Sequence, residues 1–237
     1  ATYTVKNSGG TTVTIGSTSP VGTYTITPSG LSATNYSITF TNGTLTIKKA
    51  EATCPGTITA YSGTYDGSAH SATISGGSGG TINYSTNNST WSTTVPTLTN
   101  AGSTNVYVKM IGDANHNDKT CSSTTITIAK RKVTYTATDQ SKTYDGTALS
   151  ANTTCSLTSG TLVSGHSAAC TNTGSQTNYG SSAKTLSAVT IKNSSSTDVS
   201  SNYDITKVNG TLTVNKAALT IKRSEERRVG KECRSRW

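Results

Sequence analysis

One stretch of the chain occurs twice, and this internal repeat constrains the fold more than any other feature of the sequence. Residues 35–50 (NYSITFTNGTLTIKKA) align without gaps on residues 202–217 (NYDITKVNGTLTVNKA), with 11 of 16 positions identical at an offset of 167 residues. A shorter echo pairs residues 64–69 (TYDGSA) with residues 143–148 (TYDGTA) at an offset of 79 residues. These offsets indicate a tandem array of small modules, each close to the size of one small β-sandwich.

Within the repeats, apolar residues alternate with threonine, which is the period of a β-strand and not that of a helix. Such alternation predicts half-buried antiparallel strands whose wet face carries the β-branched but polar threonine. The Asn-Gly dipeptides at positions 42–43 and 209–210 predict type I′ turns in the last hairpin of a module. The alternating residues are Val13/Ile15, Tyr24/Ile26, Leu45/Ile47, Val106/Val108/Met110, Ile126/Ile128, Val133/Tyr135 and Leu212/Val214.

The composition argues against a compact enzyme. Hydrophobic residues make up 31% of the chain and aromatic residues 6%, which is too little for one extensive core. An enzyme site usually needs a deep apolar pocket with a few converging polar groups. No apolar stretch approaches the ~18 residues of a membrane span. We therefore expect a non-catalytic protein without a membrane insertion in this segment.

The formal charge of +9 is concentrated at one end of the chain. Residues 223–237 (RSEERRVGKECRSRW) carry six basic and three acidic groups, which leaves +6 on residues 1–222. This tail resembles the translation of a sequencing adapter, and we expect it to be a non-native, disordered addition without bearing on the fold. The remaining basic residues are spread along the chain, singly or in the short groups at 48–49 and 130–132, so we expect no nucleic-acid partner.

The repeat boundaries divide the chain into modules. Lys49-Ala50, Ala129-Lys130 and Lys216-Ala217 mark ends about 80 residues apart. We expect the C-terminal part of a truncated module at 1–50, complete modules at 51–131 and 132–218, and the start of a further module at 219–222. On this interpretation the sequence begins and ends within a longer array.

The repeated motifs resemble those of the YDG-type and MBG-type repeats of large bacterial surface proteins, over residues 1–222. Residues 51–131 also resemble the companion Ig-like repeat, through residues 82–91 (INYSTNNSTW) and 112–118 (GDANHND). The resemblance implies an all-β fold of tandem Ig-like antiparallel β-sandwich modules in an elongated array. It also implies an extracellular location, at the bacterial surface or secreted, with neighbouring repeats of the same chain as partners.

Four cysteines lie outside the tail, and they can pair within modules. Cys155 and Cys170 lie in the third module, and Cys54 and Cys121 lie in the second. An even number of cysteines fits structural disulfides formed in an oxidising compartment. For Cys54 and Cys121, free thiols remain an equal alternative. No CxxC-like spacing with a nearby histidine is present, so we expect neither a metal site nor a cofactor.

Two other segments have a structural and a functional interpretation. Trp91 next to Tyr84 is a candidate sugar-stacking platform, but packing in a core or hairpin is the favoured interpretation, because large aromatic residues dominate small cores. Residues 113–118 (DANHND) resemble a calcium loop, but they lack the Gly and Glu of an EF-hand at positions six and twelve. Asx turns made by the Asn and Asp side chains are therefore the favoured interpretation.

The two Tyr-Asp-Gly elements predict turns. Asp66 and Asp145 lie in different modules, so their carboxylates cannot work as an acid–base pair. We expect Asp-Gly to set a turn in each module, with Tyr65 and Tyr144 packed against the edge of the sandwich.

The function that this sequence favours is a structural or adhesive repeat segment of a bacterial surface protein, with host or matrix glycans or proteins as expected ligands. The alternative is a carbohydrate-binding accessory module of a secreted polysaccharide-degrading protein. We expect no catalytic, cofactor-binding or metal-binding residues. The candidate residues are therefore the four cysteines as structural disulfides and Trp91 as a ligand contact.

Overall fold

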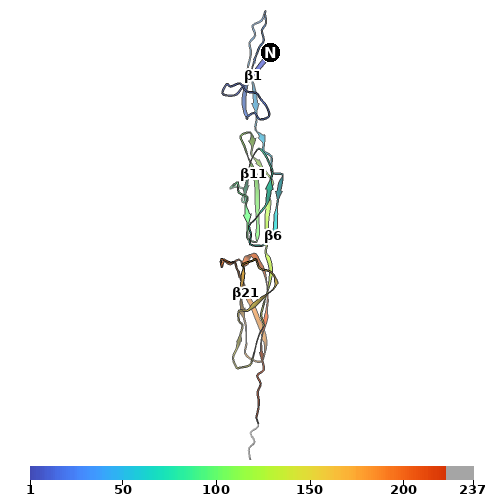
Figure 1. Ribbon diagram of the computed structural model, residues 1–237, viewed down its shortest axis with the longest axis vertical. Helices are drawn as coiled ribbons and strands as arrows, with labels where there is room; N and C mark the ends of the chain where they lie inside the picture. The colour runs from blue at the N-terminus through green and yellow to red at the C-terminus, as the bar shows by residue number, and fades with distance from the viewer. Residues whose placement is uncertain (223–237) are drawn as a thin grey trace, which may run out of the picture. The chain divides into compact units, whose positions relative to one another are not determined.

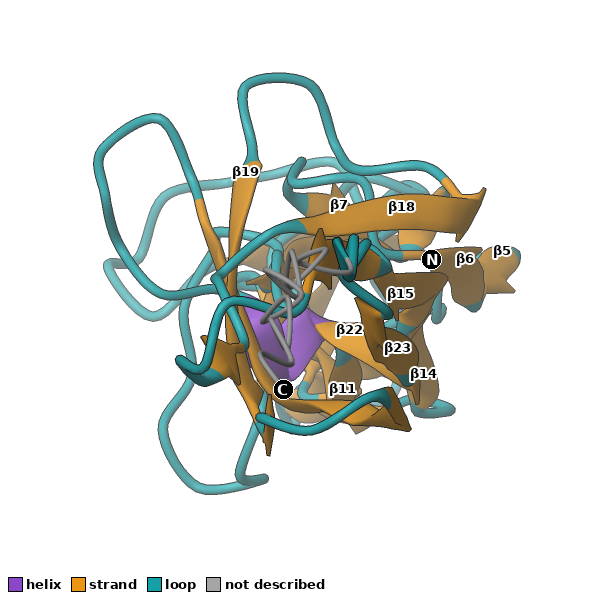
Figure 2. Ribbon diagram, turned by 90° about the horizontal axis from the view of Figure 1, so that it is seen from below, coloured by secondary structure: helices purple, strands orange, loops and turns teal. Residues whose placement is uncertain are grey.

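The computed structural model describes residues 1–222, and the tail at 223–237 lies outside the described residues. Within residues 1–222 the regular structure is β-strand, with one 3₁₀ helix at Ser200–Asn202 as the only helical element (Figure 2). No helix in this part of the chain is long and apolar enough to cross a membrane. The all-β class predicted from the alternation is confirmed.

The described chain forms two compact units. The first contains Ala1–Arg131 together with the short segment Ser201–Asp204, and the second contains Lys132–Ser200 and the chain from Ile205 onward. Figure 1 labels strands β6 and β11 of the first unit and β21 of the second.

The N-terminal part of the first unit is a three-stranded antiparallel sheet in the order β1-β2-β3, formed by β1 (Thr2–Lys6), β2 (Gly22–Ser29) and β3 (Gly43–Ile47). The strand predicted at Val13 and Ile15 is absent from this sheet, and the prediction was wrong. The Asn7 side chain accepts hydrogen bonds from the N–H groups of Gly9 and Thr11 and turns the chain there, so that only the isolated bridge Lys6–Thr12 follows.

The rest of the first unit is built around one long strand, β11. It pairs antiparallel with β9, β13 and β14, while β6 lies parallel to β14. The predicted alternation is confirmed here, because Val106, Val108 and Ile126 point into the core with Tyr84 and are at most 7% exposed. The strands are β4 (Ala50–Glu51), β5 (Thr57–Thr59), β6 (Tyr61–Thr64), β7 (His70–Ser71), β8 (Thr73–Ser75), β9 (Gly80–Ser85), β10 (Thr97–Leu98), β11 (Gly102–Gly112), β12 (His116–Asn117), β13 (Lys119–Thr120) and β14 (Thr124–Ala129).

The second unit repeats this plan. One sheet has the order β18-β15-β22, the other has the order β16-β23-β21-β19, and β16 lies parallel to β23 as β6 does to β14. Ile191, Leu212 and Val214 are fully buried in it. The strands are β15 (Arg131–Ala137), β16 (Gln140–Thr143), β17 (Leu149–Ser150), β18 (Cys155–Gly160), β19 (Ser167–Thr173), β20 (Ser175–Gln176), β21 (Gly180–Lys192), β22 (Tyr203–Val208) and β23 (Gly210–Asn215). The first residue of β15 and the first two residues of β22 belong to the first unit.

A lysine occupies the core of the second unit. Lys184 on β21 is 0% exposed, and its Nζ donates to Thr138 O at 2.8 Å and to Asn152 Oδ1 at 2.6 Å. Both partners are uncharged, and burial lowers the pKa of the Lys184 amine below its ordinary value of 10.5, although Asp139 acts in the opposite direction. The period-two pattern gave no sign of this buried cation.

The Asn-Gly dipeptides do not form the predicted type I′ turns. Neither Asn42 nor Asn209 has a positive φ, which the first position of such a turn requires. Strands β22 and β23 belong to different sheets, so positions 209–210 carry the chain from one sheet to the other. A side chain at Gly210 would clash with Ala137 O, and Asn209 Oδ1 accepts the Leu186 N–H. Glycine is needed at position 210 for close backbone approach and not for a left-handed turn.

Candidate binding surfaces

The two Tyr-Asp-Gly elements form the predicted turns. Asp66 Oδ1 accepts the Ser68 N–H at 2.8 Å, and Asp145 Oδ1 accepts the Thr147 N–H at 2.9 Å. The glycines that follow, Gly67 and Gly146, have φ of 81° and 83°. An aspartate that closes a turn on the residue two positions later, followed by a left-handed glycine, explains why Asp-Gly recurs at this place in the modules.

Each turn aspartate also binds a basic side chain. Lys142 Nζ lies 2.7 Å from Asp145 Oδ1, and this bond together with the two bonds from Thr147 holds the pKa of the Asp145 carboxyl well below its ordinary value. His70 Nε2 lies 2.9 Å from Asp66 Oδ1 and lowers the pKa of that carboxyl in the same way. Both carboxylates thus stay ionised and serve the turn.

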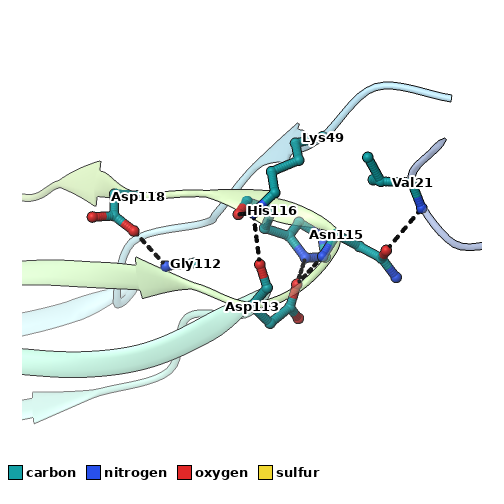
Figure 3. Close-up of polar contacts among 7 residues, drawn as sticks. All are labelled: Val21, Lys49, Gly112, Asp113, Asn115, His116 and Asp118. Carbon is teal, nitrogen blue, oxygen red and sulfur yellow. Dashed lines mark hydrogen bonds and ion pairs between the residues drawn. The ribbon is translucent and has the colours of Figure 1, made fainter. Parts of the chain in front are cut away.

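The loop predicted to be a calcium site or a set of Asx turns contains an Asx turn. Asp113 Oδ1 accepts the Asn115 N–H at 2.8 Å and faces His116 Nδ1 at 2.7 Å (Figure 3). Asp118 Oδ1 accepts the Gly112 N–H at 2.9 Å. Across residues 1–222 no cluster of three or more His, Cys, Asp or Glu side chains is arranged to hold a metal ion.

The same loop joins the N-terminal sheet to the strands that follow it within the first unit. Asn115 Oδ1 accepts the Val21 N–H at 3.1 Å, and the Asn115 carbonyl accepts the Ala50 N–H at 3.0 Å. Lys49 Nζ donates to Asp113 O at 3.2 Å, as Figure 3 shows. The polar side chains of residues 113–118 therefore act as a joint between two parts of one unit.

The structure brings the candidate cysteines together in two disulfides. Cys54 and Cys121 are bonded with a Cα–Cα distance of 5.6 Å, and Cys155 and Cys170 with one of 6.2 Å. Cys121 packs against the core of the first unit, and Cys170 is 8% exposed. Each bond connects two segments of one unit.

Trp91 lies at the end of a tightly hydrogen-bonded turn. Asn87 Oδ1 accepts the N–H groups of Ser89 and Thr90, both at 2.9 Å. Ser92 then pairs with Tyr84 through two backbone hydrogen bonds of 2.7 and 2.9 Å. Trp91 itself is half-buried, so part of its ring faces solvent from a fixed backbone.

A further cluster surrounds Tyr65, and the sequence analysis missed it. Asn202 Oδ1 accepts the Ala101 N–H at 2.7 Å, and Asn202 Nδ2 donates to Asn100 Oδ1 at 3.1 Å. The Tyr203 ring meets the Tyr65 ring edge to face at 5.6 Å between centroids. We name these five residues the Tyr65 cluster; all of them belong to the first unit.

The sequence held a signal for this cluster. Thr-Asn-x-Gly occurs at 99–102, 171–174 and 177–180, and its first and last copies stand just before the longest strand of their modules. Tyr65 is 3% exposed, as expected for a tyrosine packed against the module. Burial, followed by the nearby Tyr203, raises the pKa of the Tyr65 hydroxyl. Tyr144, its counterpart in the second unit, is 44% exposed, so the packing predicted for it was wrong.

The chain is similar to a domain family and to a solved structure. No curated protein sequence matches it. A solved structure of fibronectin(III)-like modules of Clostridium thermocellum CbhA aligns over 73% of this chain and 98% of its own, with 13% identity and a TM-score of 0.26. Residues 2–46 match the family model of the MBG domain (YGX type). The resemblance to MBG-type repeats is thereby confirmed, and residues 2–46 are the part of the chain that matches that domain family.

Proposed function

We propose that this chain is a non-catalytic repeat segment of a bacterial cell-surface protein, where it serves as a stalk and presents adhesive surfaces. The observation that carries this proposal is the recurrence of one strand plan in residues 51–131 and 132–218 after an MBG-type sequence at 2–46. MBG-type modules are typical of surface proteins. The proposed partners are neighbouring repeats and host or matrix glycans or proteins.

The polar side chains of the modules support a structural role. The carboxylates of Asp66, Asp113 and Asp145 are each engaged by a backbone N–H and a basic side chain within their own turn. Groups held in this way fix loop conformation and are poorly placed to move a proton to or from a substrate. The two disulfides fit the same proposal, since such bonds persist in extracellular compartments.

Small-angle scattering of the chain without residues 223–237 tests the proposed stalk through its radius of gyration. One compact domain of 222 residues would have a radius of gyration of ~17 Å, whereas we expect a value on the order of 25–35 Å for separate modules. A value near ~17 Å would contradict the proposal, since a chain with one shared core is no stalk.

A carbohydrate-binding accessory module is the second candidate, and Trp91 is the observation that favours it. A half-buried tryptophan on a fixed turn presents an aromatic residue that a sugar ring could stack on. A glycan array with the unmodified chain, Trp91→Ala and Trp91→Phe tests this candidate. Binding that is lost in Trp91→Ala and partly kept in Trp91→Phe would favour the carbohydrate module over the stalk. Equal binding by the three proteins would show that Trp91 does not contact the glycan.

A further inference from the structure

The two complete modules end in the same way. Tyr65 follows β6 and Tyr144 follows β16, and each of these strands lies parallel to the last strand of its module. The Tyr65 N–H donates to Ala129 O at 2.9 Å, and the Tyr144 N–H donates to Asn215 O at 2.8 Å. The two tyrosines thus occupy equivalent positions beside the last residue of β14 and of β23.

The asparagines beside them are equivalent too. Gly102 opens β11 and pairs with Ile128, while Gly180 opens β21 and pairs with Val214. These glycines have φ of 149° and 134°. Asn100-Ala101 and Asn178-Tyr179, directly before them, therefore stand at the same end of their respective modules.

In the first unit this end is covered by an Asn-Tyr dipeptide. The Asn202 amide uses both its oxygen and its nitrogen there, on Ala101 and Asn100, and Tyr203 covers Tyr65. Asn202 and Tyr203 are each 3% exposed. A primary amide that accepts one hydrogen bond and donates another fixes a single orientation, so this contact selects asparagine and not merely a polar residue.

In the second unit the equivalent end is open. Tyr144 is 44% exposed and Tyr179 is 63% exposed. Lys216 Nζ lies 4.8 Å from the centre of the Tyr179 ring. Together with Asn178 and the apolar residues Ala217, Ala218 and Leu219, these side chains line a hollow of about 540 Å³, which we name the Tyr144 surface.

The chain also presents an uncovered Asn-Tyr dipeptide. Residues 35–50 are the counterpart of residues 202–217, so Asn35-Tyr36 corresponds to Asn202-Tyr203. Tyr36 is 80% exposed, and Asn35 is exposed as well. One molecule therefore carries an open Tyr144 surface and, on its MBG-type part, the dipeptide whose counterpart covers the equivalent surface of the first unit.

We propose that the Tyr144 surface binds the Asn35-Tyr36 dipeptide of a second copy of this chain. The Asn35 amide would engage the Tyr179 N–H and the Asn178 side chain, and the Tyr36 ring would cover Tyr144. The contact is heterologous, since the two copies contribute different surfaces, and it leaves one surface of each kind free for further copies. This proposal rests on the proposed repeat segment and names a partner for it. Self-association is measured without any other ligand, whereas the stalk is tested by small-angle scattering, so failure of one proposal can be told from failure of the other.

Sedimentation velocity of the 237-residue chain over a concentration series tests the proposal. We expect reversible association with a dissociation constant on the order of 10–1,000 μM, because one dipeptide in one hollow is smaller than a standard protein interface. Tyr36→Ala and Tyr144→Ala should each weaken association at least about tenfold, which is the loss of ~1.4 kcal/mol. Tyr3→Ala and Leu157→Ala, at exposed positions outside both surfaces, should leave it unchanged.

Mixing the two defective variants gives the decisive measurement. Tyr36→Ala keeps an intact Tyr144 surface and Tyr144→Ala keeps an intact dipeptide, so an equimolar mixture should form heterodimers that stop at two chains. Asn35→Asp, which keeps the size of the side chain but removes its donor, should behave as Tyr36→Ala does. Absence of association at about 1 mM, association that survives Tyr36→Ala, or a mixture that stays monomeric would each overturn the proposal.

Discussion

At the scale of single residues, the least expected feature is the fully buried side chain of Lys184. Its acceptors belong to Thr138, Asn152 and Thr154, which are exposed residues and can bond to water if the amine is removed. Replacing a buried ionic group by an apolar one of similar volume is often neutral or stabilising. We expect Lys184→Met to unfold at an equal or higher denaturant concentration than the unmodified chain at pH 7, and Lys184→Ala to be about 2–5 kcal/mol less stable than Lys184→Met because of the cavity.

The pH dependence of stability tests the lowered pKa of the Lys184 amine. The pKa of Lys184 is lower in the folded chain than its unfolded value, so between the two values the unfolded chain binds more protons. The free energy of unfolding contributed by Lys184 should therefore rise with pH as the amine loses its proton, up to about pH 10.5. Over that pH range, the free energy of unfolding of the unmodified chain should rise relative to that of Lys184→Met. A difference that is constant from pH 7 to pH 10.5 would contradict the burial of a lysine whose pKa is lowered.

The turn glycines give a second test at this scale. Gly146 has a φ of 83°, and a side chain added there would meet no atom within 4 Å. Gly146→Ala therefore probes backbone strain alone, and we expect a loss of about 1–2 kcal/mol in the free energy of unfolding. Gly16→Ala is the matched control, since position 16 is equally open but has no positive φ. Equal effects at the two positions would refute the strain argument.

At the scale of elements, the disulfides differ in the length of chain that they close. Cys54 and Cys121 are 67 residues apart, and Cys155 and Cys170 are 15 apart. In the chain-entropy model, removing the longer closure costs about 4 kcal/mol and removing the shorter about 3 kcal/mol. We expect Cys54→Ser/Cys121→Ser to lower the urea midpoint of the first unit and Cys155→Ser/Cys170→Ser that of the second. Midpoints that do not change on reduction with dithiothreitol would show that the bonds are not formed in solution.

The sequence was informative about strands and weak about how they connect. The alternation at Val106–Val108 and at Leu212–Val214 predicted core strands because burial on one face imposes period two on the chain. It failed at Val13–Ile15, where a local asparagine turn prevails over the pattern. The prediction of a type I′ turn failed at Asn209-Gly210 because glycine is also needed where two backbones approach closely. Gly210 lies in such a place beside Ala137.

The candidate surfaces were predictable only in part. The cysteines could be paired by module from their number and position alone. The Tyr65 cluster could not, because it joins Tyr65, Asn100 and Asn202 across more than 100 positions of sequence. The Thr-Asn-x-Gly motif at 99–102 and 177–180 does not single it out, because a third copy at 171–174 lies elsewhere in its module.

At the scale of the whole molecule, each unit has a core of its own. Ile126 is fully buried in the first unit and Leu212 in the second. Modules with separate cores unfold as nearly additive parts. We expect two transitions in urea, one shifted by Ile126→Ala and the other by Leu212→Ala, each by about 2–5 kcal/mol. In the chain without residues 223–237, which removes Trp237, tryptophan fluorescence from Trp91 reports on the first unit and circular dichroism on both. A single transition shifted equally by both substitutions would contradict separate cores.

The position of the Cys54–Cys121 bond has a mechanical consequence. Tension applied between residues 51 and 131 would pass through the sulfur atoms and bypass the 67-residue span that they close. That stretch of chain would add nothing to the extended length, leaving about 14 residues, or roughly 50 Å, where the reduced module could be drawn out to a length of about 270 Å. The short closure between Cys155 and Cys170 withholds only 15 residues from the same pull. Formation of the Cys54–Cys121 bond would thus make the module at 51–131 almost inextensible, while the module at 132–218 could still unfold and extend under force. The redox state of two sulfur atoms would set the maximum length that the stretched protein can reach.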